Sequence, residues 1–91
     1  MILLELEEVL SSKSRLKILT LLNTLGSLNI SNIARQIGIN FTATSEHLKV
    51  LETEGILQVH VYGRVRMYRF KEGSAKARAI QNLIDAWQQS N

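Results

Sequence analysis

The sequence contains no cysteine and no proline among its 91 residues. Without cysteine the chain has no disulfide, no thiolate metal site and no cysteine nucleophile. It has no apolar run that approaches the roughly 20 residues of a membrane helix. The apolar N-terminal stretch is interrupted by three glutamates, a pattern that argues against a secretory signal peptide. These absences predict a cytoplasmic protein with no membrane partner.

Acidic residues are also missing from one segment, residues 59–71. This segment carries Arg64, Arg66, Arg69 and Lys71, so it contributes +4 of charge to a chain whose net charge is +3. The total alone is weak evidence for a nucleic-acid partner. Basic charge concentrated on one segment is stronger, because it is typical of a surface that binds a polyanion.

The spacing of apolar residues predicts five helices and a hairpin within one domain, residues 1–91. Apolar residues recur at helical spacing at about 2–10, 13–24, 30–37, 41–53 and 74–88. Asn29 and Asn40 are suited to cap the third and fourth helices, and Gly38 allows a sharp turn between them. From about 56 to 70 the period changes to two, with Gly63 at the turn, which predicts a β-hairpin. The predicted fold class is therefore mainly α with a small β-hairpin (α+β), in the order helix, tight turn, helix, hairpin.

The same periodicities predict the core. The second helix is apolar on more than one face, so we expect it to lie at the centre of the molecule. Thr44, Leu48 and Leu51 share the buried side of the fourth helix, and the Thr44 hydroxyl needs a partner such as a carbonyl one turn back. On the second strand of the hairpin, Tyr68 and Phe70 are expected to face the core.

A helix of this size fits the major groove of DNA, and a basic hairpin beside it is suited to grip the neighbouring backbone. In the helix-turn-helix, residues 30–53, we assign contact with DNA to the front of the fourth helix: Asn40, Phe41, Thr42, Thr44, Ser45 and Lys49. The alternative is a solvated polar face, with Phe41 docked on its own domain.

In the hairpin, or wing, we assign contact with DNA to Tyr62, Arg64, Arg66 and Arg69. The alternative is that these charges only protect an edge strand from aggregation. Weaker candidates for backbone contacts are Lys13, Arg15, Lys17 and Arg35. Arg15 is equally suited to pair with an early glutamate.

The terminal helices carry a second apolar surface, which a small core leaves without a partner. It consists of Leu3, Leu6, Leu10, Ile80, Leu83, Ile84 and Trp87. We predict self-association through both helices, and the alternative is that the last helix belongs to the intramolecular core. His47 and His60 lack a third ligand at a suitable spacing, so we expect no metal. We expect no cofactor and no enzymatic activity either, because no phosphate loop or triad is recognisable.

Residues 15–70 resemble the arsenic-repressor-like winged helix-turn-helix regulators. Arg15-Leu16-Lys17-Ile18-Leu19 is similar to the opening helix of that family, and Ile37-Gly38-Ile39 is similar to its turn. Ser45-Glu46-His47-Leu48-Lys49-Val50-Leu51 with Gly55-Ile56-Leu57 is similar to its recognition helix, and Tyr68-Arg69-Phe70 to the strand after its wing. The resemblance implies a homodimeric regulator of transcription that binds double-stranded DNA and dimerises through its first and last helices.

The chain also departs from that family. Founding members sense metals through two cysteines, where this chain has Asn29 and Ser31, and the second sensor type uses a last helix on which only Asp85 is present here. Metal sensing is therefore not expected, and any small-molecule effector is unknown. Glu46 is unusual because an acid is repelled by phosphates; it must point away or accept from cytosine N4. Two alternatives stay open: a weakly specific architectural DNA-binding protein, and a winged-helix module that binds another protein.

Overall fold

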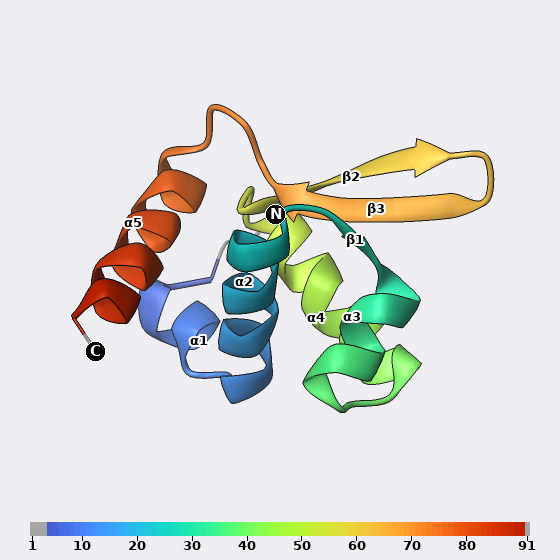
Figure 1. Ribbon diagram of the computed structural model, residues 1–91, viewed down its shortest axis with the longest axis horizontal. Helices are drawn as coiled ribbons and strands as arrows, with labels where there is room; N and C mark the ends of the chain where they lie inside the picture. The colour runs from blue at the N-terminus through green and yellow to red at the C-terminus, as the bar shows by residue number, and fades with distance from the viewer. Residues whose placement is uncertain (1–3, 91) are drawn as a thin grey trace.

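The computed structural model describes residues 4–90, which fold into five helices and three strands (Figure 1). The elements in chain order are α1 (Leu6–Leu10), α2 (Lys13–Leu25), β1 (Leu28–Asn29), α3 (Ile30–Ile37), α4 (Phe41–Thr53), β2 (Leu57–Tyr62), β3 (Val65–Phe70) and α5 (Ala75–Gln89). Helix α2 lies between two groups, with α1 and α5 on one side and α3 and α4 on the other. The β2–β3 hairpin projects away from α5 and beyond the body of the molecule. The winged helix-turn-helix prediction is confirmed.

The helix-turn-helix is defined by short side chains at the start of each helix. Asn29 Oδ1 accepts a hydrogen bond from Asn32 N at 2.9 Å, and Asn40 Oδ1 accepts one from Ala43 N at 2.7 Å. These are the caps that the sequence predicts for α3 and α4. Between the helices, Gly38 has φ 78°, a left-handed conformation that a residue with a side chain rarely adopts.

The three strands form an antiparallel sheet in the order β1-β3-β2. Leu57 pairs with Phe70 and Val59 with Tyr68 at the base of the hairpin, and Tyr62 pairs with Val65 at its tip. Strand β1 was not predicted. It has two residues, and it exists only because Leu28 and Asn29 lie beside Tyr68 and Met67 of β3. Such a short strand leaves no period in the sequence.

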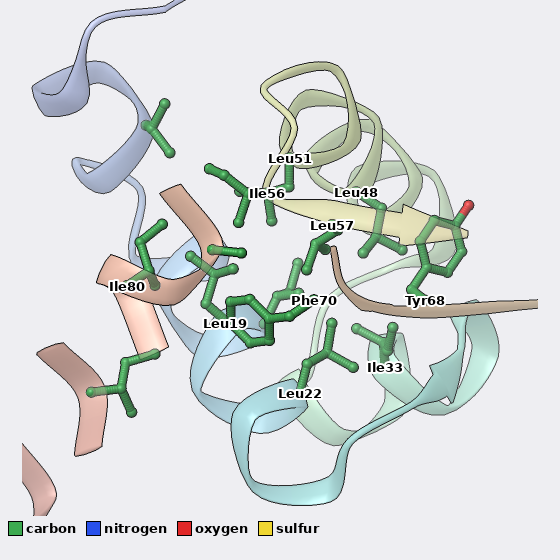
Figure 2. Packing of buried hydrophobic residues seen from close by; sticks show 14 residues of the cluster. Leu19, Leu22, Ile33, Leu48, Leu51, Ile56, Leu57, Tyr68, Phe70 and Ile80 are labelled. Carbon is green, nitrogen blue, oxygen red and sulfur yellow. The ribbon is translucent and has the colours of Figure 1, made fainter. Parts of the chain in front are cut away.

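The core lies between α2, the helix-turn-helix and the base of the sheet (Figure 2). Its fully buried members include Ile18, Leu19, Leu22, Ile33, Leu48, Leu51, Ile56 and Leu57. Tyr68 and Phe70 face this core, as predicted. Helix α2 is central but buries one face, since Leu16 and Leu25 are 38% and 50% exposed. The prediction of a helix that is apolar towards the core on several faces is therefore too broad.

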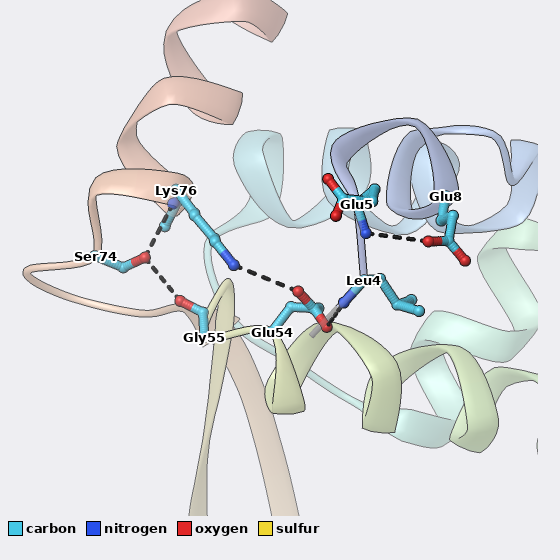
Figure 3. A network of polar contacts seen from close by, with 8 residues as sticks. Leu4, Glu5, Glu8, Glu54, Gly55, Ser74 and Lys76 are labelled. Atoms are coloured by element: carbon cyan, nitrogen blue, oxygen red, sulfur yellow. Dashed lines mark hydrogen bonds and ion pairs between the residues drawn. The ribbon is translucent and has the colours of Figure 1, made fainter. Parts of the chain in front are cut away.

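The two terminal helices differ from the sequence prediction in bounds and in burial. Helix α1 begins at Leu6, with Glu5 as its N-cap, and the Leu4 N–H before it donates to Glu54 Oε2 at 2.8 Å (Figure 3). The part of the predicted helix at residues 2–3 lies outside the described residues. On α5, Ile80 and Ile84 are each 8% exposed and belong to the intramolecular core. They therefore have little apolar area left for the predicted dimer interface, because their own domain already covers most of it.

The remaining residues of the predicted apolar surface on the terminal helices differ in how far they are exposed. Leu10 is half-buried and packs against the core. Leu6, Leu83 and Trp87 are 67%, 53% and 70% exposed. Leu3 lies outside the described residues.

Candidate nucleic-acid interface

Helix α4 presents an exposed face opposite its buried side. Thr42, Ser45 and Lys49 are exposed, and their spacing of three and four residues places them on one side of the helix. Phe41, at the start of the helix, is 56% exposed, so it is not docked into its own domain. Asn40 is exposed, and with its Oδ1 used as the cap, its NH2 group remains for an external partner. These five side chains are free to meet a ligand.

Thr44 does not belong to this face. Its exposure is 0%, and its hydroxyl donates to Asn40 O at 2.8 Å, the carbonyl one turn back that the sequence predicts. The assignment of Thr44 to DNA contact is wrong, because a group with no exposed surface cannot touch a duplex. Thr44 instead holds the start of the helix on the core.

The charge of the α4 face is mixed. Lys49 is accompanied by two exposed acids, Glu46 and Glu52. Glu46 lies on the side of the face nearer to the N-terminal segment, where it lines a shallow hollow together with Leu4 and Val50. A face with two acids and one lysine offers hydrogen-bonding groups but little net attraction for phosphates.

The wing carries the unbalanced positive charge. Arg64 lies in the two-residue turn beside Gly63, and Tyr62 before it is 64% exposed. Arg66 is exposed, and a hydrogen bond with the Tyr68 side chain raises its pKa, with smaller contributions from the charges of Tyr68 and Glu52. Exposed arginines at the end of a hairpin are suited to phosphates and to a narrow minor groove.

Arg69 differs from the other two wing arginines. It pairs with Gln58 at the base of the hairpin, and its Nη2 lies 2.5 Å from Glu72 Oε1. An exposed ion pair of this kind is weak, so it does not prevent a contact with DNA.

Arg15 is a structural residue. Its Nη2 donates to Glu8 O at 2.7 Å, its Nε donates to Val9 O at 3.0 Å, and its Nη1 lies 3.3 Å from His47 Nδ1. It thus joins the end of α1 to α4, through main-chain carbonyls rather than through a glutamate side chain as the sequence suggested. Burial lowers the pKa of His47, and the Arg15 charge lowers it further, against a smaller opposing effect of Glu46.

Two features near this surface were not predicted from the sequence. Val61 and Val65 at the wing tip are 58% and 45% exposed. The hairpin extends past the body of the molecule, so no core is present at its tip (Figure 1).

The second feature is Glu54, which is 5% exposed and lies at the end of α4. Its carboxylate accepts from Leu4 N at 2.8 Å and from Lys76 Nζ at 3.3 Å (Figure 3). It therefore ties the fourth helix to the N-terminal segment and to α5. In the sequence, only the opposite charge of Lys76 is consistent with this contact, and four other lysines carry the same charge.

No group of three acidic, histidine or cysteine side chains that could hold a metal ion occurs among residues 4–90. Within the same residues, every helix is too short or too polar to cross a membrane.

Known proteins share this architecture. Residues 12–59, more than half of the chain, match the family described as bacterial regulatory protein, arsR family. The transcriptional repressor BigR from Xylella fastidiosa is 25% identical over 92% of this chain and 81% of its own, with a TM-score of 0.78. The homodimeric winged helix-turn-helix DNA-binding domain Mb0332 from Mycobacterium bovis is 25% identical over 92% and 75%, with a TM-score of 0.73.

A third solved structure, HlyU from Vibrio cholerae, supports the fold alone. It is 21% identical over 90% of this chain and 83% of its own, with a TM-score of 0.77. No curated protein sequence matches the chain significantly. The chain belongs to the arsR family of bacterial regulatory proteins, and it is a winged-helix DNA-binding regulator of transcription, not an enzyme.

Proposed function

We propose that the chain is a homodimer that binds a specific duplex sequence, with α4 in the major groove and the wing on the flanking minor groove or backbone. The observation that carries this proposal is that the face of α4 and the wing tip are both exposed. Phe41, Thr42, Ser45 and Lys49 are available for base and phosphate contacts. Arg64 and Arg66 are available for the backbone beside them.

The apolar side chains left exposed on the terminal helices support the dimer. Leu6, Leu83 and Trp87 keep more than half of their surface exposed, and α1 and α5 lie on the same side of the molecule (Figure 1). Exposed apolar side chains on two such helices are typical of a protein interface. The similar domain from Mycobacterium bovis is homodimeric. A second copy of this chain is therefore the partner that we propose for this surface.

Twofold symmetry has a consequence for the DNA. Two copies of α4 would lie in successive major grooves, so the site would be pseudo-palindromic with half-sites roughly 34 Å apart. Contacts of lysines and arginines with phosphates would make the affinity fall steeply with salt.

We further propose that the regulator does not sense metals through the positions used by founding members of its family. The sequence has no cysteine, and Asn29 Oδ1 is occupied as the cap of α3. On α5, Asp85 Oδ1 accepts from Asn23 Nδ2 at 2.8 Å, so the acid of that helix is engaged with an amide. Side chains already used by the fold are poor candidates for a sensor site.

Selection of bound sequences from random duplex DNA tests the DNA-binding proposal. We expect a pseudo-palindromic motif, and an affinity for it that falls linearly on a plot of log affinity against log salt. Binding without any motif would indicate an architectural protein instead. Failure to bind any duplex at low salt would favour a module that binds another protein.

Sedimentation of Trp87→Glu tests the dimer. A buried charge at the centre of an apolar interface should yield monomers, with a loss of affinity for the palindrome of roughly 10² to 10⁴-fold because the two half-sites no longer bind together. Asn82→Glu is the matched control, since it adds the same charge at an exposed position elsewhere on α5. A dimeric Trp87→Glu protein would show that this surface is not the interface.

A further inference from the structure

Glu46 occupies a reading position on α4. It is the sixth residue of the helix, is exposed, and lies four residues after Thr42 and three before Lys49. Those intervals place its side chain on the outward side of the helix, opposite Leu48 and Thr44. Residues in the first turns of a recognition helix are the ones that reach base edges. A glutamate there extends further from the helix than Ser45 beside it.

Among residues 4–90, no hydrogen bond or ion pair engages the Glu46 carboxylate. The two ion pairs found among residues 4–90 join Arg69 to Glu72 and Lys76 to Glu54. Beside a duplex, an uncompensated carboxylate is repelled by phosphates, so it lowers the affinity for every sequence. It favours one sequence over another only where a base donates a hydrogen bond to it.

The major groove offers two such donors, cytosine N4 and adenine N6. Adenine N6 lies next to N7, an acceptor whose lone pair repels a carboxylate, and adenine is better matched by an amide that both donates and accepts. Guanine presents acceptors at N7 and O6, and thymine presents an acceptor at O4. We propose that Glu46 determines specificity by accepting a hydrogen bond from cytosine N4, so that each half-site contains one C·G pair selected by this residue. This inference rests on the proposed function, in which α4 lies in the major groove.

Selection from random duplex DNA by the full chain and by two variants tests this contact. The unchanged protein should return one strongly preferred C·G pair in each half-site. Glu46→Gln should change that one position to A·T, because an amide pairs with adenine N6 and N7. Glu46→Ala should leave the position without preference. At that base pair alone, the change in relative affinity should be roughly tenfold to a hundredfold.

Glu52→Gln is the matched control. It removes the same charge from an exposed position on the same helix, six residues further on. It should raise the affinity for all sequences alike and leave the motif unchanged. Thermal unfolding should be the same for Glu46→Gln and the unchanged protein, since the Glu46 side chain has no hydrogen bond or ion pair among residues 4–90 to lose.

Two results separate the failure of this inference from the failure of the proposed function. If both Glu46 variants keep the motif of the unchanged protein and only bind all DNA more tightly, Glu46 merely repels phosphates, and the inference is overturned while the proposed function stands. If the unchanged protein returns no motif, sequence-specific binding fails and this inference fails with it.

Discussion

Helix α4 and the wing are neighbours in the fold, yet their charges differ. The exposed face of α4 has one lysine and two glutamates, among short hydroxyl side chains. The hairpin carries three arginines and no acid. Phosphate attraction grows with the number of cations, whereas base recognition needs hydrogen-bonding groups at fixed positions. The difference suggests that the wing supplies most of the affinity and α4 most of the sequence preference.

The packing of the two elements is suited to this division. The buried side of α4 consists of Thr44, Leu48 and Leu51, each 0% exposed, so the position of its outer face is fixed by the core. The wing tip has no such support beyond the pairing of its two strands (Figure 1). A rigid helix is suited to read bases, and a protruding hairpin is suited to follow a backbone whose shape varies.

Removal of the wing charge should have the largest effect. Arg64→Ala combined with Arg66→Ala should weaken binding to all duplex sequences, by roughly tenfold for each arginine, or about 1.4 kcal/mol each. The slope of log affinity against log salt should fall by roughly two, one for each lost phosphate contact. Gel-shift titration across salt concentrations measures both quantities.

Arg78→Ala is the matched control, because it removes an exposed arginine from α5, in a hollow beside Arg69 at the base of the wing rather than at its tip. Its salt slope should equal that of the unchanged protein. A double wing variant that selects a different motif, at unchanged salt slope, would reverse the roles assigned to the two elements.

Adjacent residues of α4 sharpen the comparison. Thr44→Val removes a buried hydroxyl bonded to Asn40 O, so the free energy of unfolding should fall by about 0.5–1.5 kcal/mol while the preferred DNA sequence stays the same. Ser45→Ala, at an exposed position one residue on, should leave stability within about 0.5 kcal/mol and alter the preferred sequence. Urea unfolding measures the stability of the two variants, and selection from random duplexes measures their sequence preference. A change of motif in Thr44→Val without loss of stability would contradict the burial of this side chain.

A smaller effect is expected from pH. Burial and the Arg15 charge lower the pKa of His47 from its ordinary value of 6.5, so the unfolded chain takes up the proton first as pH falls. The contribution of His47 to stability is therefore complete above about pH 6.5 and declines as pH falls below that value, until the folded protein is protonated too. The unchanged protein should lose more stability than His47→Gln between about pH 7.5 and 5.5. Urea unfolding at the two pH values measures this difference.

His60→Gln is the matched control, because it removes the other imidazole of the chain from an exposed strand. If both histidine variants change the pH dependence of stability equally, then burial of His47 beside Arg15 is not the cause of that dependence.

The helix-turn-helix could be predicted closely because its information is local. Asn29, Asn40 and Gly38 mark the ends of α3 and α4, and the observed bounds, Ile30–Ile37 and Phe41–Thr53, are those predicted. Caps and left-handed glycines act within a few residues of their own position, so a single sequence is enough to recognise them. The exposed and buried sides of α4 followed from the same helical period, apart from Thr44, which the sequence assigned to both sides.

Contacts between distant residues could not be predicted in this way. Ile80 and Ile84 lie on the same apolar stripe as Leu83 and Trp87, and only the position of α5 against α2 decides which of them the core covers. Glu54 becomes a buried carboxylate because Leu4 and Lys76 come to it from opposite ends of the chain. Arg15 donates to main-chain carbonyls of α1, and no residue type in the sequence marks such a contact.

By itself, the sequence determined the order of the elements, the turn between α3 and α4, the basic wing and the absence of thiolate chemistry. Each of these depends on residue type or on spacing along the chain. Only the tertiary structure decided which apolar residues remain exposed, which arginines remain free, and that Thr44 is covered while Glu46 is not. Exposure depends on what the rest of the molecule places beside a residue, and for these residues the neighbours come from segments far away in the chain.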